Sequence, residues 1–292
     1  MENNKGDSNQ ITRDYFDSLM IEMRHIDSDI PDTKINLFGH EFSMPITTAA
    51  LSHLNNTAED GMEKMAKGAY LSNALCFSGM GEKSEIKAMC ATGAKVIKIV
   101  KPHRDNEKVF EKIHEAEEAG AFAVGMDIDH AFSGDGQYDN VLGLPMKSKS
   151  FEEMQSFVKA TKLPFIVKGV LSIEDAKKCL DMGAAGIIVS HHHGIMNYAI
   201  PPLMILPKIK DLIGDRIPIF ADCCFESGMD VFKALALGAD AVCVGRAIMP
   251  PLKENGAEGV SQKLSSMNQE LKAVMERTAF KDLDKIDTSV IY

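Results

Sequence analysis

Short apolar runs alternate with amphipathic helical segments along the whole chain. This alternation predicts a parallel sheet whose faces are covered by helices. Eight apolar runs favour a closed (β/α)8 barrel, an α/β TIM barrel, over an open doubly wound sheet. The expected strands are Pro45–Leu51, Ala74–Ser78, Lys95–Val100, Phe122–Ile128, Phe165–Val170, Gly186–Ser190, Ile217–Asp222 and Ala241–Val244.

Several of the helical segments begin with a Ser or Thr followed three positions later by Asp. This spacing resembles a capping box, in which each side chain bonds the backbone N–H near the other. The pairs are Thr57 with Asp60, Ser172 with Asp175, and Ser227 with Asp230.

No break in composition indicates a second domain. We therefore expect one barrel domain over residues 16–292, preceded by a flexible N-terminal tail over residues 1–15. The longest stretch without a clear element, Asp129–Lys149, is rich in Gly and Asp and follows the fourth strand. A long loop at that end of a strand usually belongs to an active site.

Composition excludes several classes of function. A net charge of −10 over 292 residues argues against a nucleic-acid partner, which needs a basic surface. No apolar run approaches the roughly 18 residues of a membrane span, and the polar start has no signal core. The six cysteines lack CxxC spacing, so we expect free thiols in a cytoplasmic protein.

Polar residues follow each of the last four expected strands. Because the carboxyl ends of all barrel strands meet at one rim, these residues are expected to lie together in an active site. They are Lys168 in the fifth strand, His191, His192 and His193 after the sixth, Asp222, Cys223 and Cys224 at the end of the seventh, and Gly245 and Arg246 after the eighth.

Lys168 is the most informative of these residues. A lysine in a buried strand needs an anionic partner, because burying an ammonium group alone costs free energy. Lys168 could pair with a carboxylate of the barrel, form a Schiff base, or stabilise negative charge on a cofactor.

The three adjacent histidines do not indicate a metal site. Consecutive residues at a strand end point in different directions, so they seldom ligate one ion together. One of them acting as a general base is the better interpretation, and no metal ligand is predicted. The adjacent Cys223 and Cys224 are expected to pack rather than to form a strained disulfide.

The loops after the last two strands are the usual phosphate site of such barrels. Gly245 allows close approach of the backbone to an anion. Arg246 can bind phosphate oxygens through two N–H groups. These residues predict a ligand that carries a phosphate.

At this point the sequence resembles a known family, the FMN-dependent 2-hydroxy-acid oxidases and dehydrogenases. The resemblance is specific over Leu163–Gly194 and Gly214–Met249, and weaker over Phe38–Ser52 and Ala116–Asp129. It implies a barrel with FMN across the strand ends, a small-molecule substrate and a homo-oligomer, a tetramer in this family.

The resemblance also implies roles for individual residues. Lys168 matches the family lysine near flavin N1 and O2, and His192 matches the catalytic base. The phosphate loops match Asp222–Gly228 and Gly245–Arg246. The full set expected to bind the cofactor is Ala50, Leu51, Ser78, Lys98, Asp127, Lys168, Ser190, Asp222, Cys223, Cys224, Gly245 and Arg246.

The chain departs from the family pattern where substrate and phosphate would bind. Ile195 and Phe132 stand where the family has arginines that hold the substrate. The family pattern Gln-Leu-Tyr in the third strand matches Lys98-Ile99-Val100, so Lys98 is expected to supply a replacement charge. Asp127 replaces a threonine. Glu226 replaces a phosphate-binding arginine, and a carboxylate would repel a phosphate.

These departures predict an FMN-dependent oxidoreductase with an altered substrate site. One alternative is a flavin barrel without net redox chemistry, similar to the type 2 isopentenyl diphosphate isomerases. Another is a phosphate-binding barrel without flavin, or an inactive descendant.

Overall fold

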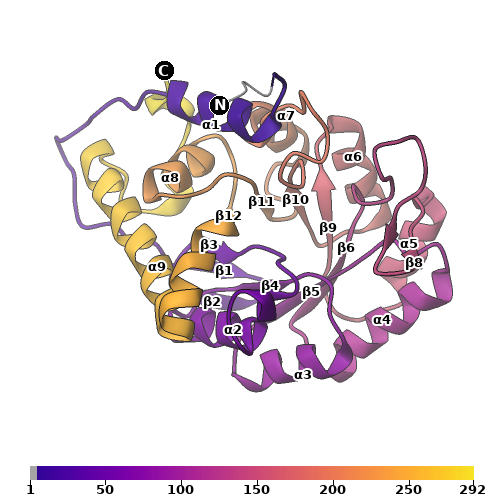
Figure 1. Ribbon diagram of the computed structural model, residues 1–292. Coiled ribbons are helices and arrows are strands. Elements are labelled where there is room, and N and C mark those ends of the chain that lie inside the picture. Colours follow the sequence, from indigo (N-terminus) through magenta and orange to yellow (C-terminus); the bar gives the residue numbers. More distant parts are fainter. Residues whose placement is uncertain (1–4) are drawn as a thin grey trace.

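The computed structural model describes residues 5–292 and shows a sheet of parallel strands surrounded by helices (Figure 1). The strand order is β3-β12-β11-β10-β9-β6-β5-β4. The eight strands are β3 (Ile46–Thr48), β4 (Cys76–Ser78), β5 (Val96–Val100), β6 (Ala123–Asp127), β9 (Phe165–Val170), β10 (Gly186–Val189), β11 (Ile219–Ala221) and β12 (Ala241–Val244). Each lies within a predicted strand, so the eight-strand prediction is confirmed.

The two end strands of this order, β3 and β4, meet and close the sheet. The Thr48 N–H donates to the carbonyl of Leu75 at 3.2 Å, and the Gly79 N–H donates to that of Leu51 at 2.8 Å. The fold is the predicted (β/α)8 barrel.

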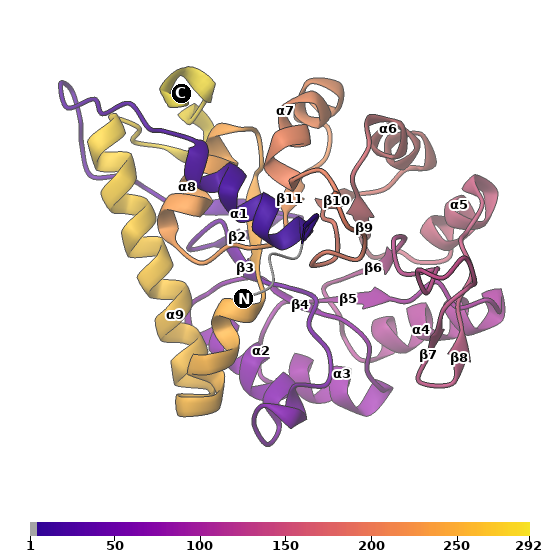
Figure 2. The same cartoon turned by 45° about the horizontal axis from the view of Figure 1, so that its top comes forward.

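The helices form the outer layer around the strands (Figure 2). None of the helices formed by residues 5–292 is long and apolar enough to cross a membrane. The helices are α1 (Ser8–Ser18), α2 (Gly61–Leu71), α3 (Lys83–Ala91), α4 (Asn106–Glu118), α5 (Phe151–Lys159), α6 (Ile173–Met182), α7 (Pro202–Ile213), α8 (Gly228–Ala236) and α9 (Met249–Thr278).

Buried apolar residues form two separate clusters, one on each side of the barrel wall. Ile97 and Ile99 of β5 belong to the inner cluster, with Phe77 and Phe220 from other strands. Val96 and Val100 of the same strand belong to the outer cluster, between the strands and the helices. Because side chains alternate along a strand, these two sets fix the direction in which every residue of β5 points.

A small hairpin closes the end of the barrel opposite the strand carboxyl ends. Its strands are β1 (Ile35–Leu37) and β2 (His40–Phe42), which pair antiparallel. Phe38 in its turn packs 6.4 Å from the ring of Phe220 and 6.2 Å from that of Phe122. This end is therefore filled by aromatic side chains, which leaves the other rim for a ligand.

Two of the three predicted helix starts are present. Ser227 and Asp230 form a reciprocal capping box at the start of α8. The Ser172 hydroxyl accepts from the Asp175 N–H at the start of α6. The prediction at Thr57 is wrong, because α2 begins only at Gly61 and its N-cap makes no side-chain hydrogen bond. A 3-10 turn over Leu54–Asn56 takes up the preceding residues.

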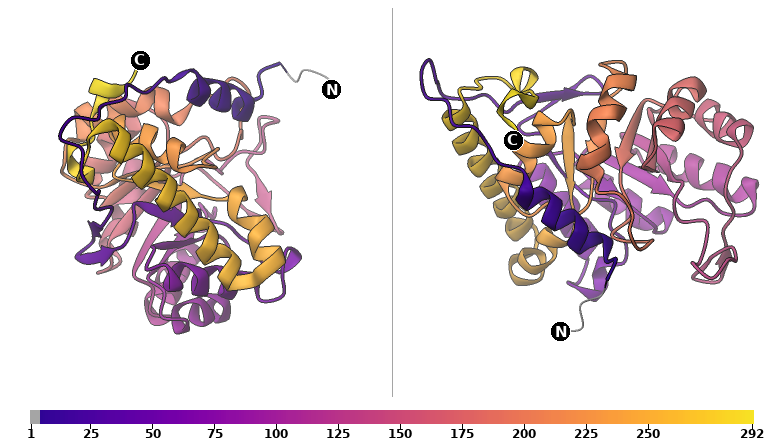
Figure 3. Two further views of the ribbon diagram at one scale, coloured as in Figure 1. Left: turned by 90° about the vertical axis from the view of Figure 1, so that its left-hand side faces the viewer. Right: turned by 90° about the horizontal axis from the view of Figure 1, so that it is seen from above.

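The N-terminal segment differs from the predicted tail over residues 1–15. Residues 1–4 lie outside the described part of the chain, but Ser8–Ser18 is helix α1, and it lies across the loops after β10 and β11 (Figure 3). The Asp7 side chain caps it by accepting from the Asn9 N–H at 2.9 Å. Phe16 is fully buried, 5.2 Å from the ring of Phe225. Burial of Phe16, together with that of Ser8 and Thr12, is a tertiary contribution that a short polar segment does not reveal.

The loop after β6 contains a small hairpin of its own. Within residues 129–149, β7 (Asn140–Val141) pairs antiparallel with β8 (Leu144–Pro145). The hairpin stands beside the barrel rim, and Leu142 and Leu144 line a cavity there.

Candidate active site

A cluster of charged side chains lies at the carboxyl ends of β6, β9, β10 and β11. The Lys168 ammonium is 3.1 Å from Oδ1 of Asp127, 3.2 Å from Nδ1 of His192 and 3.9 Å from Oδ2 of Asp222. Lys168 is only 5% exposed. The structure therefore brings four of the predicted site residues together.

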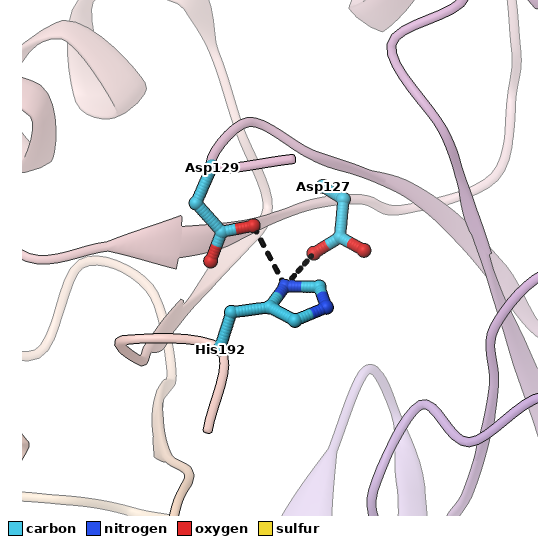
Figure 4. Close-up of side chains that lie close together, drawn as sticks. All are labelled: Asp127, Asp129 and His192. Carbon is cyan, nitrogen blue, oxygen red and sulfur yellow. Dashed lines mark hydrogen bonds and ion pairs between the residues drawn. The ribbon is translucent and has the colours of Figure 1, made fainter. Parts of the chain in front are cut away.

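The imidazole of His192 points toward two carboxylates from the end of β6 (Figure 4). Its Nδ1 lies 2.8 Å from Oδ1 of Asp129 and 3.5 Å from Oδ1 of Asp127. The shorter distance assigns the single Nδ1 proton to Asp129. Nε2, on the opposite side of the ring, is then the nitrogen with a free lone pair. This is the tautomer that a general base requires.

The charges of the cluster reinforce one another. Burial disfavours the charged form of Lys168, but Asp127, Asp129 and Asp222 outweigh it and raise the pKa of the ammonium above its usual value. Burial would raise the pKa of Asp127, yet Lys168 and the other cations hold it well below the ordinary range.

The pKa of His192 is also shifted. Burial disfavours its protonation, but the adjacent carboxylates of Asp127 and Asp129 dominate and raise the pKa above that of an ordinary histidine. Burial lowers the pKa of the neighbouring His191 and His193 instead. Of the three adjacent histidines, only His192 combines a carboxylate partner with this upward shift.

Lys101 is a further member of the cluster that the sequence did not reveal. Its ammonium lies 2.6 Å from Oδ2 of Asp127, and the residue is 9% exposed. Asp127 therefore binds two ammonium groups, one through each carboxylate oxygen. Asp127 stands where the family pattern has a threonine. Lys101, which follows the neighbouring strand β5, balances the negative charge of Asp127.

The structure corrects the expected position of Lys98. Ile97 and Ile99 face the interior of the barrel, so Lys98 lies on the outer side of the wall. Its ammonium donates to the carbonyls of Gly79 and Gly81, and burial lowers its pKa to about 8. Lys98 therefore does not point at the charge cluster.

A shift of one residue in the sequence match explains this error. Moving the match by one position exchanges the inner and outer faces of a strand. The first and third residues of the family pattern Gln-Leu-Tyr face inward. In the structure Ile99 and Lys101 hold these inward positions, in place of Lys98 and Val100. Lys101 is thus the inward cation that had been expected at Lys98.

A cavity of about 390 Å³ opens beside the charge cluster at the barrel rim. It is bordered by the ends of β3, β9, β11 and β12 and by helix α1. The predicted site residues that line it are Ala50, Leu51, Lys168, His192, Asp222, Cys223, Cys224, Gly245 and Arg246.

Besides Lys98, three predicted residues do not line this cavity. Asp127 lies behind Lys168 in the charge cluster. Ser190 supports the site from beneath, since its hydroxyl donates to Asp222 at 3.0 Å and accepts from the His192 N–H at 3.0 Å. Ser78 is fully buried at the end of β4, away from the cavity.

The backbone after β11 forms an unusual turn, in which the Cys223 N–H already donates to Oδ1 of Asp222 at 2.8 Å. Cys223 and Cys224 have φ angles of +82° and +63°, a left-handed conformation that residues with a side chain rarely adopt. Successive residues in such turns can direct their N–H groups to a common concave face. The geometry usual for glycine is therefore kept here by two cysteines. Burial raises the pKa of both thiols, to about 12 and about 11, so they are neutral packing groups.

Gly245, after β12, allows a ligand to approach the backbone closely on the side of the cavity opposite the turn after β11. A Cβ at this position would lie 3.3 Å from the Cβ of Ala49, tighter than ordinary contact. Arg246, which follows it, is exposed and lines the cavity. A bound phosphate group fits this combination of a close backbone approach at Gly245 and the exposed guanidinium of Arg246.

A second cavity of about 450 Å³ lies at the same rim, on the side of β4 and β5. Lys101, Met80 and the hairpin residues Leu142 and Leu144 line it. Lys101 and Asp127 therefore stand between this second cavity and the one that holds Lys168 and His192.

The donor atoms of Asp127, Asp129 and His192 lie within 4.8 Å of one another, a spacing that a metal ion could bridge. The Lys168 ammonium, 3.1 Å from Asp127, already occupies the cation position and would repel a metal. That the site binds no metal stays a prediction.

Comparison with known proteins places this geometry in a family. The model of the FMN-dependent dehydrogenases matches residues 2–153 and 143–292. The chain belongs to the FMN-dependent dehydrogenase family. It is therefore an oxidoreductase of the FMN-dependent hydroxy-acid oxidase and dehydrogenase type, and FMN is its cofactor.

Individual relatives agree with this assignment. The chain is 28% identical to a 2-hydroxyacid oxidase of Dictyostelium discoideum, with 91% of this chain and 77% of that protein covered. It is 27% identical to a glycolate oxidase of Spinacia oleracea over 89% of this chain and 80% of that protein. Among solved structures it resembles a mandelate oxidase variant bearing an FMN adduct, with a TM-score of 0.87, 25% identity, and 96% and 89% of the two chains covered.

Proposed function

We propose that this protein oxidises a small 2-hydroxy acid at the carbon that bears the hydroxyl group, with His192 as the general base. The observation that carries the proposal is the 2.8 Å contact between Nδ1 of His192 and Oδ1 of Asp129, which favours a proton on Nδ1 and leaves Nε2 as the proton acceptor. When bound, FMN supplies the acceptor for the two electrons that leave the substrate.

His192 takes a proton from the substrate through Nε2 and becomes an imidazolium. Asp129 and Asp127, at 2.8 Å and 3.5 Å from Nδ1, stabilise that positive charge. The raised pKa of His192 expresses the same stabilisation. Above its pKa, His192 is neutral and can accept a proton from the substrate. The raised pKa then lets the imidazolium hold that proton during turnover.

Lys168 places a permanent positive charge in the wall of the cavity that holds His192. Its raised pKa keeps it protonated throughout the physiological range. A fixed ammonium in a site of low solvent access stabilises negative charge that develops beside it. We assign it this role toward the cofactor.

Lys101 is the cation that we assign to the substrate carboxylate. Ile195 and Phe132 remove the arginines that the family pattern would supply. Lys101 faces inward, is nearly buried, and lines the cavity on the far side of the charge cluster from Arg246. A single ammonium gives a one-point contact where an arginine gives two, so the substrate site differs from the family pattern.

The experiment that tests the function begins with the purified protein reconstituted with FMN. Under anaerobic conditions, one of a panel of 2-hydroxy acids should bleach the absorbance of the bound flavin, and the matching 2-oxo acid should form. A protein that binds FMN but is bleached by none of them, while a non-redox isomerase substrate turns over, would contradict the proposal.

We also propose that the protein is a cytoplasmic homo-oligomer, a tetramer as the family resemblance implies. Met20, Met23, Ile26 and Ile30 expose apolar side chains along one segment after α1, which is typical of a surface covered by another copy of the chain. All six cysteines are free thiols, which fits a reducing compartment. Light scattering of the purified protein measures the number of subunits.

A further inference from the structure

The phosphate end of the cavity contains a second arginine, which comes from helix α1. Arg13 lines the same cavity as Arg246, Cys224 and Glu226. We propose that Arg13 is a cofactor-binding residue that supplies to the FMN phosphate the positive charge lost where Glu226 replaces an arginine. This inference rests on the function proposed above and adds a residue from outside the two matching phosphate loops.

The position of Arg13 is fixed by its own hydrogen bonds. Its Nη1 donates to the carbonyl of Cys224 at 3.3 Å, which places the guanidinium against the left-handed turn after β11. Its Nη2 donates to Asp230 at 2.8 Å and to Asp17 at 2.7 Å, and its Nε donates to Asp17 at 3.1 Å. These four bonds leave one N–H of Nη1 for a ligand. That N–H is on the nitrogen that touches the turn.

The surrounding carboxylates explain why a second cation is needed. Asp7 and Glu226 line the cavity, and Asp230 is buried behind Arg13. Asp17 is largely exposed, so water screens its charge. Asp222 also lines the cavity, but it lies 3.9 Å from the Lys168 ammonium. Without Arg13, a phosphate beside Arg246 would face the carboxylates of Asp7, Glu226 and Asp230 with no second guanidinium to offset them. With Arg13, the charge of Asp230 is neutralised, and the one remaining N–H of the guanidinium is on the nitrogen that contacts the turn.

Helix α1 is built into the same region at several points. The Asn9 side-chain amide donates to the carbonyl of His193 at 3.1 Å, and Thr12 Oγ1 lies 2.8 Å from Nε2 of His191. The Lys233 ammonium donates to the carbonyl of Phe16 at 2.6 Å. These contacts hold α1 in place by themselves, so loss of the Arg13 charge leaves the helix docked.

Comparison of FMN with riboflavin, which lacks the phosphate, isolates the contribution of Arg13. The affinity of each is measured with apoprotein by quenching of flavin fluorescence. Arg13→Gln should weaken FMN binding by roughly 10- to 100-fold, as for loss of a charged hydrogen-bond donor. Riboflavin affinity should change by less than about threefold, because riboflavin has no charge for Arg13 to bind.

Two further variants complete the test. Arg277→Gln makes the same change in net charge at an exposed position in the last turn of α9, and it should leave both affinities unchanged. Glu226→Arg added to Arg13→Gln should restore the preference for FMN over riboflavin. Equal losses for FMN and riboflavin, or no loss for FMN, would overturn the assignment of Arg13. A wild-type protein that binds neither flavin would instead overturn the proposed function.

Discussion

Asp129 Oδ1 lies 2.8 Å from Nδ1 of His192, although the two residues are 63 positions apart in the sequence. The contact joins the loop after β6 to the loop after β10, and it favours the tautomer with the proton on Nδ1. An aspartate that sets the tautomer of a catalytic histidine affects both its basicity and its orientation.

Asp129→Asn therefore should change the pH dependence of the reaction. His192 must be neutral to accept a proton, so kcat/KM falls as the pH drops through its pKa, which is raised above the ordinary histidine value. Loss of the carboxylate lowers that pKa, so the acid limb of the profile should move to lower pH while the maximal rate falls. Asp139→Asn, which alters the partner of His130 at 3.1 Å, should leave the limb in place.

His192→Ala should slow substrate oxidation by roughly 10²–10⁴-fold, the usual contribution of a general base. FMN affinity should change little, so the bound-flavin spectrum provides a check on folding. His193→Gln is the matched control from the next position and should retain most of the rate. A normal rate for His192→Ala with a large loss for His193→Gln would show that His193, and not His192, is the base.

Lys168→Met should slow reduction of the bound flavin by roughly 10²–10³-fold, because a preorganised charge next to developing negative charge is lost. Stopped-flow absorbance under anaerobic conditions measures the step directly. Lys162→Met removes an exposed lysine just before β9 and should leave the rate unchanged. If Lys168→Met reduces at the wild-type rate, Lys168 has no part in the step.

Lys101→Met and Lys98→Met form a pair that tests the register of β5. Lys101 faces inward toward Asp127, whereas Lys98 lies on the outer side of the barrel wall. Lys101→Met should raise KM for an anionic substrate by roughly 10-fold or more, with a smaller effect on FMN affinity. Lys98 also borders the second cavity, but its ammonium is held by the carbonyls of Gly79 and Gly81, so Lys98→Met should leave KM near its wild-type value. The opposite result would restore Lys98 as the substrate cation.

Cys224→Gly should increase stability or leave it unchanged. A residue with a side chain in the left-handed conformation costs about 1–2 kcal/mol, and glycine relieves this strain. The greater freedom of glycine in the unfolded chain cancels about 0.5–1 kcal/mol of the resulting gain in stability. Thermal unfolding of the apoprotein measures the difference. A large loss of stability would show that the thiol packs more favourably than the backbone is strained.

The strands were predictable from the sequence because each apolar run is short, buried on both faces and followed by a helix. The rim position of Lys168 and His192 followed from the same topology. Side-chain direction within a strand was harder, since the apolar residues of β5 occupy both faces and give no alternation to fix the register. Lys98 and Lys101 were therefore indistinguishable until the two cores were seen.

The contribution of α1 was hidden for a different reason. Its helix is held by contacts with loops near the other end of the chain, such as that between Thr12 and His191. No local pattern in a polar segment reports a partner at that distance. Asp129 and Arg13 were missed as site residues for the same reason, because only the folded barrel brings them to the imidazole and to the turn after β11.

The docking of α1 also has a consequence for how the protein is made. Helix α1 is synthesised before the barrel strands, but its partners Phe225 and Lys233 follow only after most of the barrel. Until then Phe16 has no surface to cover it, and closing so long a loop is slow. The wall that carries Arg13 is thus among the last parts of the nascent protein to assemble, after β9 with Lys168 and the loop with His192 have been synthesised.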